Sequence, residues 1–256
     1  MNSSFIHTIV EREEVGSTSD LARSLLEGGG VELPLLVRAD RQTAGRGRGA
    51  HSWWSDEGSL AITIGLDPET VGLRPEHGPR LALASAVALV DAVSPLIPKG
   101  MAPGIRWPND VEVGGRKLAG TLPERIETAT GPKILIGIGL NVSTRLENAP
   151  EAVRLMATTV EALRPPWASP LCPSDLLGPF LDRFAAALEA LTRDDEALAE
   201  QWSQLDTLIG RRVRVDLGPR IIVGTGRGID RQGGLRLETE GETITLLGGQ
   251  VLRDRL

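Results

Sequence analysis

The chain has 256 residues, a formal net charge of −6, 41% hydrophobic residues and 24% charged residues, a composition typical of a soluble globular protein. Its single cysteine excludes an intrachain disulfide framework, and a chain of this length can bury a core without a disulfide or a metal. The acidic balance argues against a general RNA or DNA binder, because such proteins neutralise phosphates with clustered lysines and arginines.

The N-terminal segment MNSSFIHTIVEREE has no basic region followed by an apolar core, so it does not resemble a secretory signal. The longest apolar runs, LALASAVALV and KILIGIGL, are shorter than the roughly 20 residues that span a bilayer. We therefore expect a cytoplasmic protein without a membrane partner.

The first part of the chain predicts alternating strands and helices. Residues 5–15 alternate as a strand does, and residues 17–30 begin with a Ser/Thr/Ser/Asp cluster, continue apolar at helical spacing and end in three glycines. Residues 33–43 and 58–66 predict two strands that flank a loop rich in glycine and arginine. Residues 79–97 predict the most clearly defined helix, which ends at prolines.

The middle of the chain predicts a hairpin over residues 104–126, with a Gly-Gly turn at its tip. Residues 132–142 predict a buried strand, and residues 173–206 are helical in pattern. Residues 143–172 show no clear period.

The pattern changes after about Leu208, where short alternating strands separated by tight turns begin. They predict a small β-barrel appended to an α/β domain, with the catalytic domain over residues 1–207 and the barrel over residues 208–256. The four strands are expected at 211–217, 220–229, 234–241 and 242–249.

The loop between the second and third predicted strands has the sequence QTAGRGRGAHSWW, residues 42–54. Glycines let backbone N–H groups approach a ligand closely, and arginines present a planar fork to carboxylate or phosphate. The stretch alone leaves three interpretations open: a loop around a small anionic ligand, a solvated turn, or an RG-type RNA-binding segment. The last usually lies in a long disordered tract, whereas strands flank this loop.

Two later segments carry candidate chemistry. In RWPNDVEVGGRKLAGTL, residues 106–122, the hairpin would return Lys117 to the vicinity of Asp110, where an acid and a lysine could hold a phosphate with its metal. The alternative is a hairpin with ordinary surface charges. In GIGLNV, residues 137–142, glycines inside a buried strand can mark the close approach of a ligand or of backbone.

In this order and at these spacings, AGRGR, WPND with KLAG, and GIGLNV resemble the catalytic domain of biotin–protein ligases. VGSTSD is similar to the family's Ser-Thr-Asn biotin segment, and GRGIDRQGGLRL with LLGGQV resembles its small C-terminal barrel. The resemblance covers nearly the whole chain and is weakest at residues 143–205. It implies an α/β (α+β) fold, namely a mixed-sheet, class II synthetase-like ligase domain followed by an SH3-like β-barrel.

The resemblance also implies the reaction. Biotin would be activated with ATP and Mg²⁺ to biotinoyl-5'-AMP, and then transferred to a lysine of a biotin carboxyl carrier protein. Nothing before the first strand resembles a winged helix-turn-helix, so we expect the short form of the family, with no nucleic acid partner. A sheet edge near the end of the catalytic domain could pair with a second copy, as a homodimer, or with the acceptor.

Residue roles follow from the matching motifs. The expected catalytic residues are Lys117, Arg48 and Asp110, with Asp110 also a candidate Mg²⁺ ligand. The expected biotin contacts are Ser17, Thr18, Gln42, Gly45, Arg46, Lys117 and Gly120. The expected ATP or adenylate contacts are Arg48, Trp53, Asn109, Asn141 and Arg227.

The sequence departs from the family pattern in the glycine-rich loop. The family usually continues Gly-Arg-Gly-Arg-x-Gly-Arg-x-Trp, whereas here Ala50 replaces the later glycine and His51 the later arginine. A permanent cation is thereby exchanged for an imidazole, which is charged only when it is protonated. Ser19 stands where asparagine is usual, and Arg106 stands for the common lysine.

Two alternatives compete with this interpretation, a related ligase and a protein of a different functional class. A lipoate or octanoyl ligase shares the fold class, but its loop is of the Arg-Arg-x-Ser-Gly-Gly-Gly type, which GRGRGAHSWW does not match. A non-catalytic nucleotide or RNA binder is disfavoured by the acidic net charge and by the intact Asp110 and Lys117 hairpin.

Overall fold

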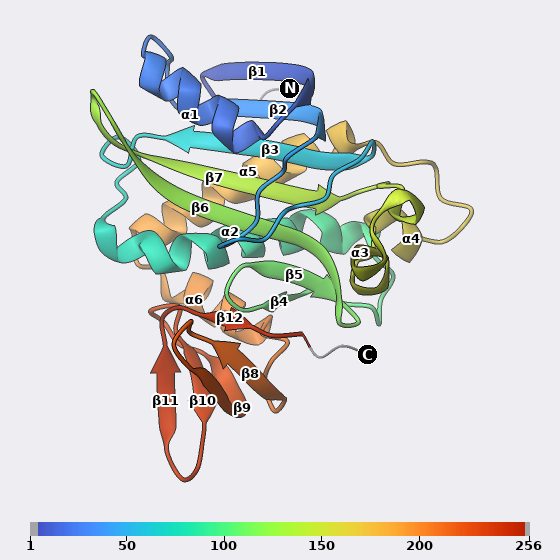
Figure 1. The fold of residues 1–256 in the computed structure, drawn as a ribbon, viewed down its shortest axis with the longest axis vertical. Helices are drawn as coiled ribbons and strands as arrows, with labels where there is room; N and C mark the ends of the chain where they lie inside the picture. Colours follow the sequence, from blue (N-terminus) through green and yellow to red (C-terminus); the bar gives the residue numbers. More distant parts are fainter. Residues whose placement is uncertain (1–4, 254–256) are drawn as a thin grey trace.

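The computed structural model describes residues 5–253 and contains two β-sheets, with helices packed on both faces of the larger one (Figure 1). The larger sheet has the strand order β1-β2-β3-β7-β6-β5-β4 and the smaller one the order β11-β10-β9-β8-β12. The strands of the larger sheet are β1 (Thr8–Val15), β2 (Leu35–Gln42), β3 (Ser59–Leu66), β4 (Gly104–Arg106), β5 (Asp110–Val113), β6 (Arg116–Thr128) and β7 (Gly131–Asn141). Those of the smaller sheet are β8 (Arg212–Asp216), β9 (Ile221–Ile229), β10 (Leu235–Glu238), β11 (Thr243–Leu246) and β12 (Gln250–Val251).

Six α-helices complete the fold. They are α1 (Thr18–Gly28), α2 (Gly78–Val93), α3 (Glu151–Met156), α4 (Val160–Leu163), α5 (Pro173–Thr192) and α6 (Glu196–Gln204). Single 3-10 turns lie at Pro75–His77, Ser94–Leu96 and Leu146–Asn148.

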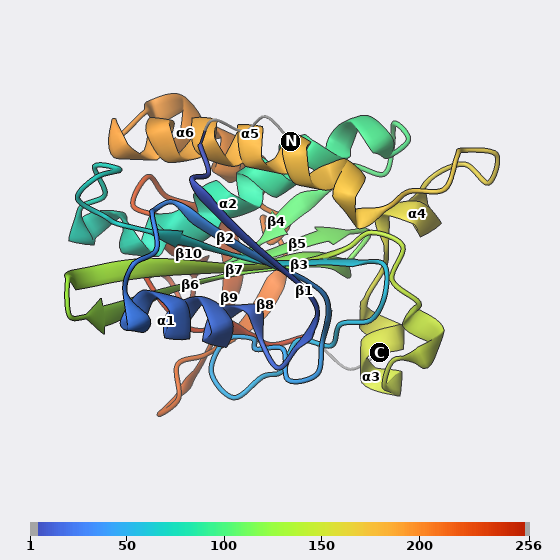
Figure 2. The same ribbon diagram turned by 90° about the horizontal axis from the view of Figure 1, so that it is seen from above.

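The larger sheet is mixed and covered on both faces. β1 and β2 are parallel, and the other neighbouring strands are antiparallel. Helix α1 lies on one face, and α2 and α5 lie on the other (Figure 2). Every residue of β3 is therefore buried, which explains why its sequence SLAITIGL is almost continuously apolar.

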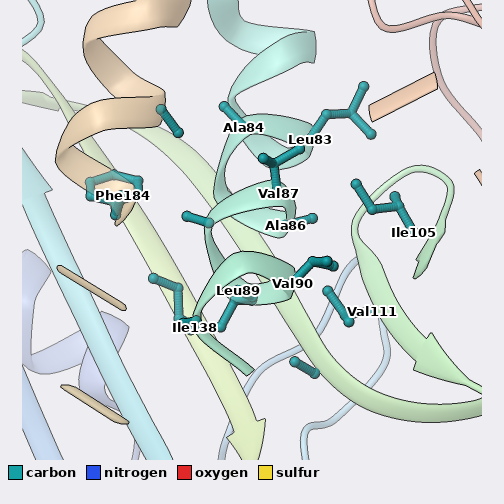
Figure 3. Packing of buried hydrophobic residues seen from close by; sticks show 14 of the residues in the cluster. Leu83, Ala84, Ala86, Val87, Leu89, Val90, Ile105, Val111, Ile138 and Phe184 are labelled. Atoms are coloured by element: carbon teal, nitrogen blue, oxygen red, sulfur yellow. The ribbon is translucent and has the colours of Figure 1, made fainter. Parts of the chain in front are cut away.

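The main core lies between the sheet and the α2–α5 layer. Leu83, Val87 and Val90 of α2 pack among residues of the sheet and of α5, including Ile138 and Phe184 (Figure 3). The helical stretch Pro75–Leu96 is long and apolar enough to cross a membrane, but 67% of its most apolar window is buried inside this fold. Its hydrophobicity is thus that of a core helix, apolar around most of its circumference.

The smaller domain is held against the β4–β5 end of the larger sheet by two buried tryptophans. The indole N–H of Trp107 donates to the carbonyl of Gly233 at 2.9 Å, and that of Trp202 donates to Asp230 at 3.0 Å. Both acceptors lie in the β9–β10 turn. The backbone of Ile105 is also bonded to the connection at Leu205, with an N···O distance of 2.7 Å. These bonds fix the domain so that β12 and Leu252 lie beside the larger sheet, where Nη2 of Arg106 donates to the carbonyl of Leu252 at 3.1 Å (Figure 1).

The predicted elements are found, with two differences. β12 forms a fifth strand of the small domain, where four were expected; it has only two residues and depends on pairing with β8. Residues 143–172, which showed no period, contain the 3-10 turn Leu146–Asn148 and two short helices, α3 and α4, of six and four residues. A segment that short cannot display a helical repeat in its sequence.

Asp206 lies at the junction of the two domains, and its buried carboxyl should make the free energy of unfolding depend on pH. Burial, reinforced by Glu112, raises its pKa from 3.8 to about 6, so the folded state binds a proton more tightly than the unfolded chain. Stability therefore falls as pH rises from 3.8 to about 6, and ionised Asp206 costs about 2–3 kcal/mol at neutral pH. We expect Asp206→Asn to raise the free energy of unfolding by about 2 kcal/mol at pH 7.5, with a gain that shrinks towards pH 4.

Urea unfolding at the two pH values measures this effect. Asp182→Asn is the matched control, because Asp182 is exposed, and it should change stability at neither pH. An equal gain for Asp206→Asn at both pH values would show that its ionisation is not the cause.

Candidate active site

A cavity of about 750 Å³ opens on the α1 face of the larger sheet. It is lined by the start of α1, the loop 42–54, the β5–β6 hairpin, the middle of β7, the helix α3, and the turns 216–218 and 249–253 of the small domain. The cavity thus brings together all three sequence segments that carried candidate chemistry.

Glycines form the floor of the cavity. Gly139 of β7 pairs with Gly120 of β6, and the indole of Trp53 lies directly on Gly139. A Cβ at Gly139 would come within 2.3 Å of the ring, and a Cβ at Gly137 would come within 3.0 Å of the Ser19 hydroxyl. The glycines of GIGLNV are therefore explained by close approach, as their position inside a strand indicated.

One end of the cavity presents a buried cluster of small polar groups. The backbone N–H and the hydroxyl of Thr18 donate to Oε1 of Gln42 at 2.8 and 3.0 Å. The Thr63 hydroxyl lies 2.9 Å from that of Thr18 and 3.0 Å from that of Ser19. Ser17, Thr18 and Gln42 thus lie together, as expected, in a place suited to a ring that both donates and accepts hydrogen bonds. Thr63 is fully buried behind the lining of the cavity, and it was not predicted because it is one polar residue within an apolar strand.

The other end of the cavity is charged. Nζ of Lys117 lies 2.6 Å from Oδ1 of Asp110, and Nη2 of Arg253 lies 3.4 Å from its Oδ2. Lys117 is also 5.4 Å from the ring centroid of Trp53, a cation–π distance. An irregularity in the β5–β6 register after Val111 accompanies this return of Lys117 to Asp110.

The loop 42–54 forms a small hairpin across the cavity. Arg46 and Ser52 form a β-bridge, and the N–H of Trp53 donates to the carbonyl of Gly45 at 2.8 Å. At the tip, the guanidinium of Arg48 donates to the carbonyl of Gly249 in the small domain. Partial desolvation there lowers the pKa of Arg48. The loop is therefore closed between the two domains.

The structure places Arg227, an expected nucleotide contact, outside the cavity. This residue is exposed on β9, where its Nε donates to Glu238 at 2.7 Å, and it does not line the cavity. Alternation along the strand buries its neighbours Gly226 and Gly228 and turns Arg227 outwards. Arg253 is instead the arginine of the small domain that reaches the cavity.

Two residues of the glycine-rich loop differ in detail from expectation. Gly45 does not line the cavity but supports the loop, since a Cβ there would lie 2.5 Å from the Trp53 carbonyl oxygen. Arg46 lines the cavity, but its guanidinium is paired with Asp20 at 3.2 Å and with Glu124 at 2.6 Å. Its side chain thus fastens the loop to α1 and β6.

The two expected asparagines line the cavity and also hold its walls. The amide of Asn109 donates to the carbonyl of Thr121 at 2.6 Å, and that of Asn141 donates to Thr158 at 3.1 Å. The bond from Asn141 secures the chain just after α3. Helix α3 and the residue that follows it add an apolar wall that the sequence did not predict. This wall is formed by Ala152, Val153, Met156 and Ala157.

The donor set does not form a metal site by itself. Within residues 5–253, no group of three or more His, Cys, Asp or Glu side chains could hold a metal ion. Asp110, the expected Mg²⁺ ligand, is paired with Lys117 and Arg253. Mg²⁺ is commonly held by one or two carboxylates together with substrate phosphates, so Asp110 fits only as one ligand beside a bound nucleotide.

Two family models match the chain. The model described as "Biotin/lipoate A/B protein ligase family" matches residues 13–141, and "Biotin protein ligase C terminal domain" matches residues 208–253. The first match contains the hairpin, the loop and the glycine floor, and the second contains the strands of the small domain.

Curated relatives match over most of the chain. Biotin–[acetyl-CoA-carboxylase] ligase of Mycobacterium tuberculosis (strain ATCC 25618 / H37Rv) is 33% identical, over 94% of this chain and 87% of the relative. Bifunctional ligase/repressor BirA of Escherichia coli (strain K12) is 32% identical, over 83% of this chain and 64% of that protein.

Solved structures share the fold. Biotin protein ligase from Aquifex aeolicus in complex with biotin and ATP superposes with a TM-score of 0.80 at 25% identity, covering 96% of this chain and 98% of that one. The enzyme from Leishmania major in complex with biotinyl-5-AMP gives a TM-score of 0.62 at 25% identity, covering 95% and 98%.

Proposed function

Because the chain belongs to the biotin/lipoate A/B protein ligase family, we infer that it is a biotin protein ligase that joins biotin to an acceptor protein with ATP. Relatives of this chain are named for acetyl-CoA carboxylase, so we propose the biotin carrier domain of such a carboxylase as the acceptor. The observation that carries the proposal is the single cavity with buried hydroxyls at one end and the Lys117–Asp110 pair at the other.

The reaction has two steps. The biotin carboxylate attacks the α-phosphorus of ATP, the bond to pyrophosphate breaks, and biotinoyl-5'-AMP forms. The amine of an acceptor lysine then attacks the biotinoyl carbonyl, and AMP leaves. The first step brings two anions together and the second joins two separate molecules, so the protein must neutralise charge in the first and position the reactants in both.

We assign the binding roles from the position of each group in the cavity. The Thr18 and Gln42 cluster would take the polar ring of biotin, whose tail would run along the exposed side of the Trp53 indole towards Lys117. Lys117 and Arg48 would bind the biotin carboxylate and the α-phosphate, each through charged hydrogen bonds worth about 1.5–3 kcal/mol. The apolar wall of α3 and the amides of Asn109 and Asn141 would contain the nucleotide.

We propose that Mg²⁺ enters with ATP, held by Asp110 and phosphate oxygens, and supplies charge neutralisation. Asp110 also orients Lys117, whose ammonium it holds at 2.6 Å. The closed loop 42–54 would exclude water from the reactive adenylate until the acceptor arrives.

The decisive experiment is direct. Purified protein with ATP, Mg²⁺ and biotin should add one biotin to one lysine of a carboxyl carrier domain, read by intact mass and peptide mapping. The parallel reaction with lipoate should give no product. Transfer of lipoate without transfer of biotin would overturn the proposal and favour a lipoate ligase.

Removing the side chain that closes the loop should release the intermediate. We expect Arg48→Gly to free biotinoyl-AMP, because the guanidinium that joins the loop to Gly249 and offsets phosphate charge is lost. The released adenylate should label lysines of an unrelated bystander protein, and chromatography should detect it in solution. Arg145→Gly is the control, since Arg145 is exposed and paired only with Glu57 at 3.3 Å. No more release than from the wild type would show that Arg48 does not retain the adenylate.

A further inference from the structure

Three polar side chains meet where the loop touches the small domain. His51 comes from the loop, Gln250 from β12 and Asp216 from β8, and all three line the cavity. Nε2 of His51 lies 3.1 Å from Oε1 of Gln250 and 2.8 Å from its Nε2, so the amide can bond the ring through either atom. Gln250 and Asp216 are register partners in an antiparallel pair, which places their side chains next to each other on one face.

The second step of the reaction needs a proton acceptor. A free lysine has an ordinary pKa of about 10.4, so the acceptor amine arrives as an ammonium and cannot attack a carbonyl until it loses a proton. Among the described residues that line the cavity, carboxylates or imidazoles are present only at Asp110, Asp216 and His51. Asp110 is already paired with Lys117 and Arg253, which leaves the pair at the loop tip.

The position of this pair suits an incoming side chain. His51 is exposed, and Asp216 is half-buried, with Oδ1 accepting from the N–H of Gly218 at 2.7 Å. Both belong to segments at the contact between the loop and the small domain. At the same loop tip, the guanidinium of Arg48 donates to the carbonyl of Gly249, the residue before Gln250. An acceptor lysine that reaches the cavity here meets a carboxylate and an imidazole.

We propose that His51 is the general base of the transfer step, that Gln250 positions its ring, and that Asp216 attracts the acceptor ammonium. The proposal rests on the proposed function. The ammonium gives one proton to the imidazole, which becomes imidazolium with Gln250 accepting a hydrogen bond from it. The neutral amine attacks the biotinoyl carbonyl, the bond from the carbonyl carbon to the phosphate oxygen breaks, and the second amine proton leaves with AMP.

The base would stand where this chain departs from the usual loop pattern of the family it resembles. That pattern has arginine at the position of His51, and arginine is a permanent cation that cannot accept a proton. Histidine at this position therefore removes a permanent positive charge and adds a nitrogen that can accept a proton. This contrast supplies the most informative variant, because His51→Arg restores the family residue and keeps a donor for Gln250.

The test separates the two steps. Pyrophosphate release without acceptor reports adenylate formation, and single-turnover transfer from preformed adenylate reports the second step. At pH 7 we expect His51→Arg and His51→Gln to slow transfer to the carrier lysine by about 10²-fold, the lower range of general-base contributions. Hydroxylamine is unprotonated at neutral pH and needs no base, so its reaction with enzyme-bound adenylate should stay within about two-fold of wild type.

Separate kinetic measurements test the roles proposed for Asp216 and Gln250. Asp216→Asn should raise the KM for the carrier domain more than it lowers kcat. Gln250→Ala should slow transfer to lysine but not to hydroxylamine, and Gln250→Glu, which keeps an acceptor oxygen, should restore it. His7→Gln is the matched control, because His7 is exposed and does not line the cavity.

Each outcome decides the question. Transfer to lysine at the wild-type rate in His51→Arg would overturn the proposal, as would an equal loss with hydroxylamine, which would assign His51 to holding the loop. In either case the proposed function stands if the wild type forms adenylate. A wild type that releases no pyrophosphate with biotin would overturn the proposed function, and this proposal with it.

Discussion

Replacing Lys117 with glutamine is expected to slow biotinoyl-AMP formation by about 10²–10³-fold, the usual effect of removing a preorganised charge from a transition state. The ammonium lies 2.6 Å from Asp110 and over the ring of Trp53, inside the cavity that would hold both anionic substrates. Without it the biotin carboxylate must approach the α-phosphate with less charge neutralised, and Asp110 loses a partner. Pyrophosphate release in the presence of biotin, ATP and Mg²⁺ measures the effect.

The chain offers a control with the same chemical change. Lys99 is exposed and does not line the cavity, so Lys99→Gln should leave the rate unchanged. Lys117→Arg keeps the charge but not the compact ammonium, and should recover only part of the rate. Pyrophosphate release from Lys117→Gln within a few-fold of wild type would remove Lys117 from the chemistry.

The second large effect is expected at Gly139. A Cβ there would lie 2.3 Å from Cε2 of Trp53, so Gly139→Ala must push the indole off the floor of the cavity. Losing the aromatic surface that packs against the ligand should cost about 2–3 kcal/mol of binding free energy, which corresponds to about 30- to 160-fold weaker biotin binding. Calorimetric titration with biotin measures this loss, and tryptophan fluorescence reports the displaced ring.

A double variant distinguishes displacement of the ring from general damage. If the indole is the only obstacle, Gly139→Ala should weaken binding little further once Trp53→Ala has removed it, so the two effects should not add. Gly178→Ala is the control, because a Cβ there meets nothing within 4 Å. Additive losses would contradict a shared cause.

The sequence predicted the parts of the site that depend on short segments. Thr18 and Gln42 meet because β1 and β2 are neighbours, and Lys117 returns to Asp110 because a Gly-Gly turn joins β5 to β6. Such contacts follow from local turns and strand pairing, which leave signals in the sequence. The family resemblance then supplied their roles, which the patterns alone left open.

The contacts made by the small domain were not predictable in the same way. Arg227 was expected at the nucleotide, but it lies outside the cavity and is paired with Glu238, whereas Arg253, which was not expected, lines the cavity. Likewise, nothing local joins His51 to Gln250, which is 199 residues away in sequence. These contacts are set by how one domain docks on the other, through the indole bonds of Trp107 and Trp202, and no period or turn signal encodes them.

Those indole bonds have a consequence for dividing the chain. A fragment that ends at residue 207 would leave the N–H groups of Trp107 and Trp202 without their acceptors and expose two large aromatic surfaces. We therefore expect a chain cut between the two sheets to be less stable in each part than in the whole. Each fragment would also lack part of the cavity lining. Ligase activity would then require the two fragments to associate, so the activity would measure their association.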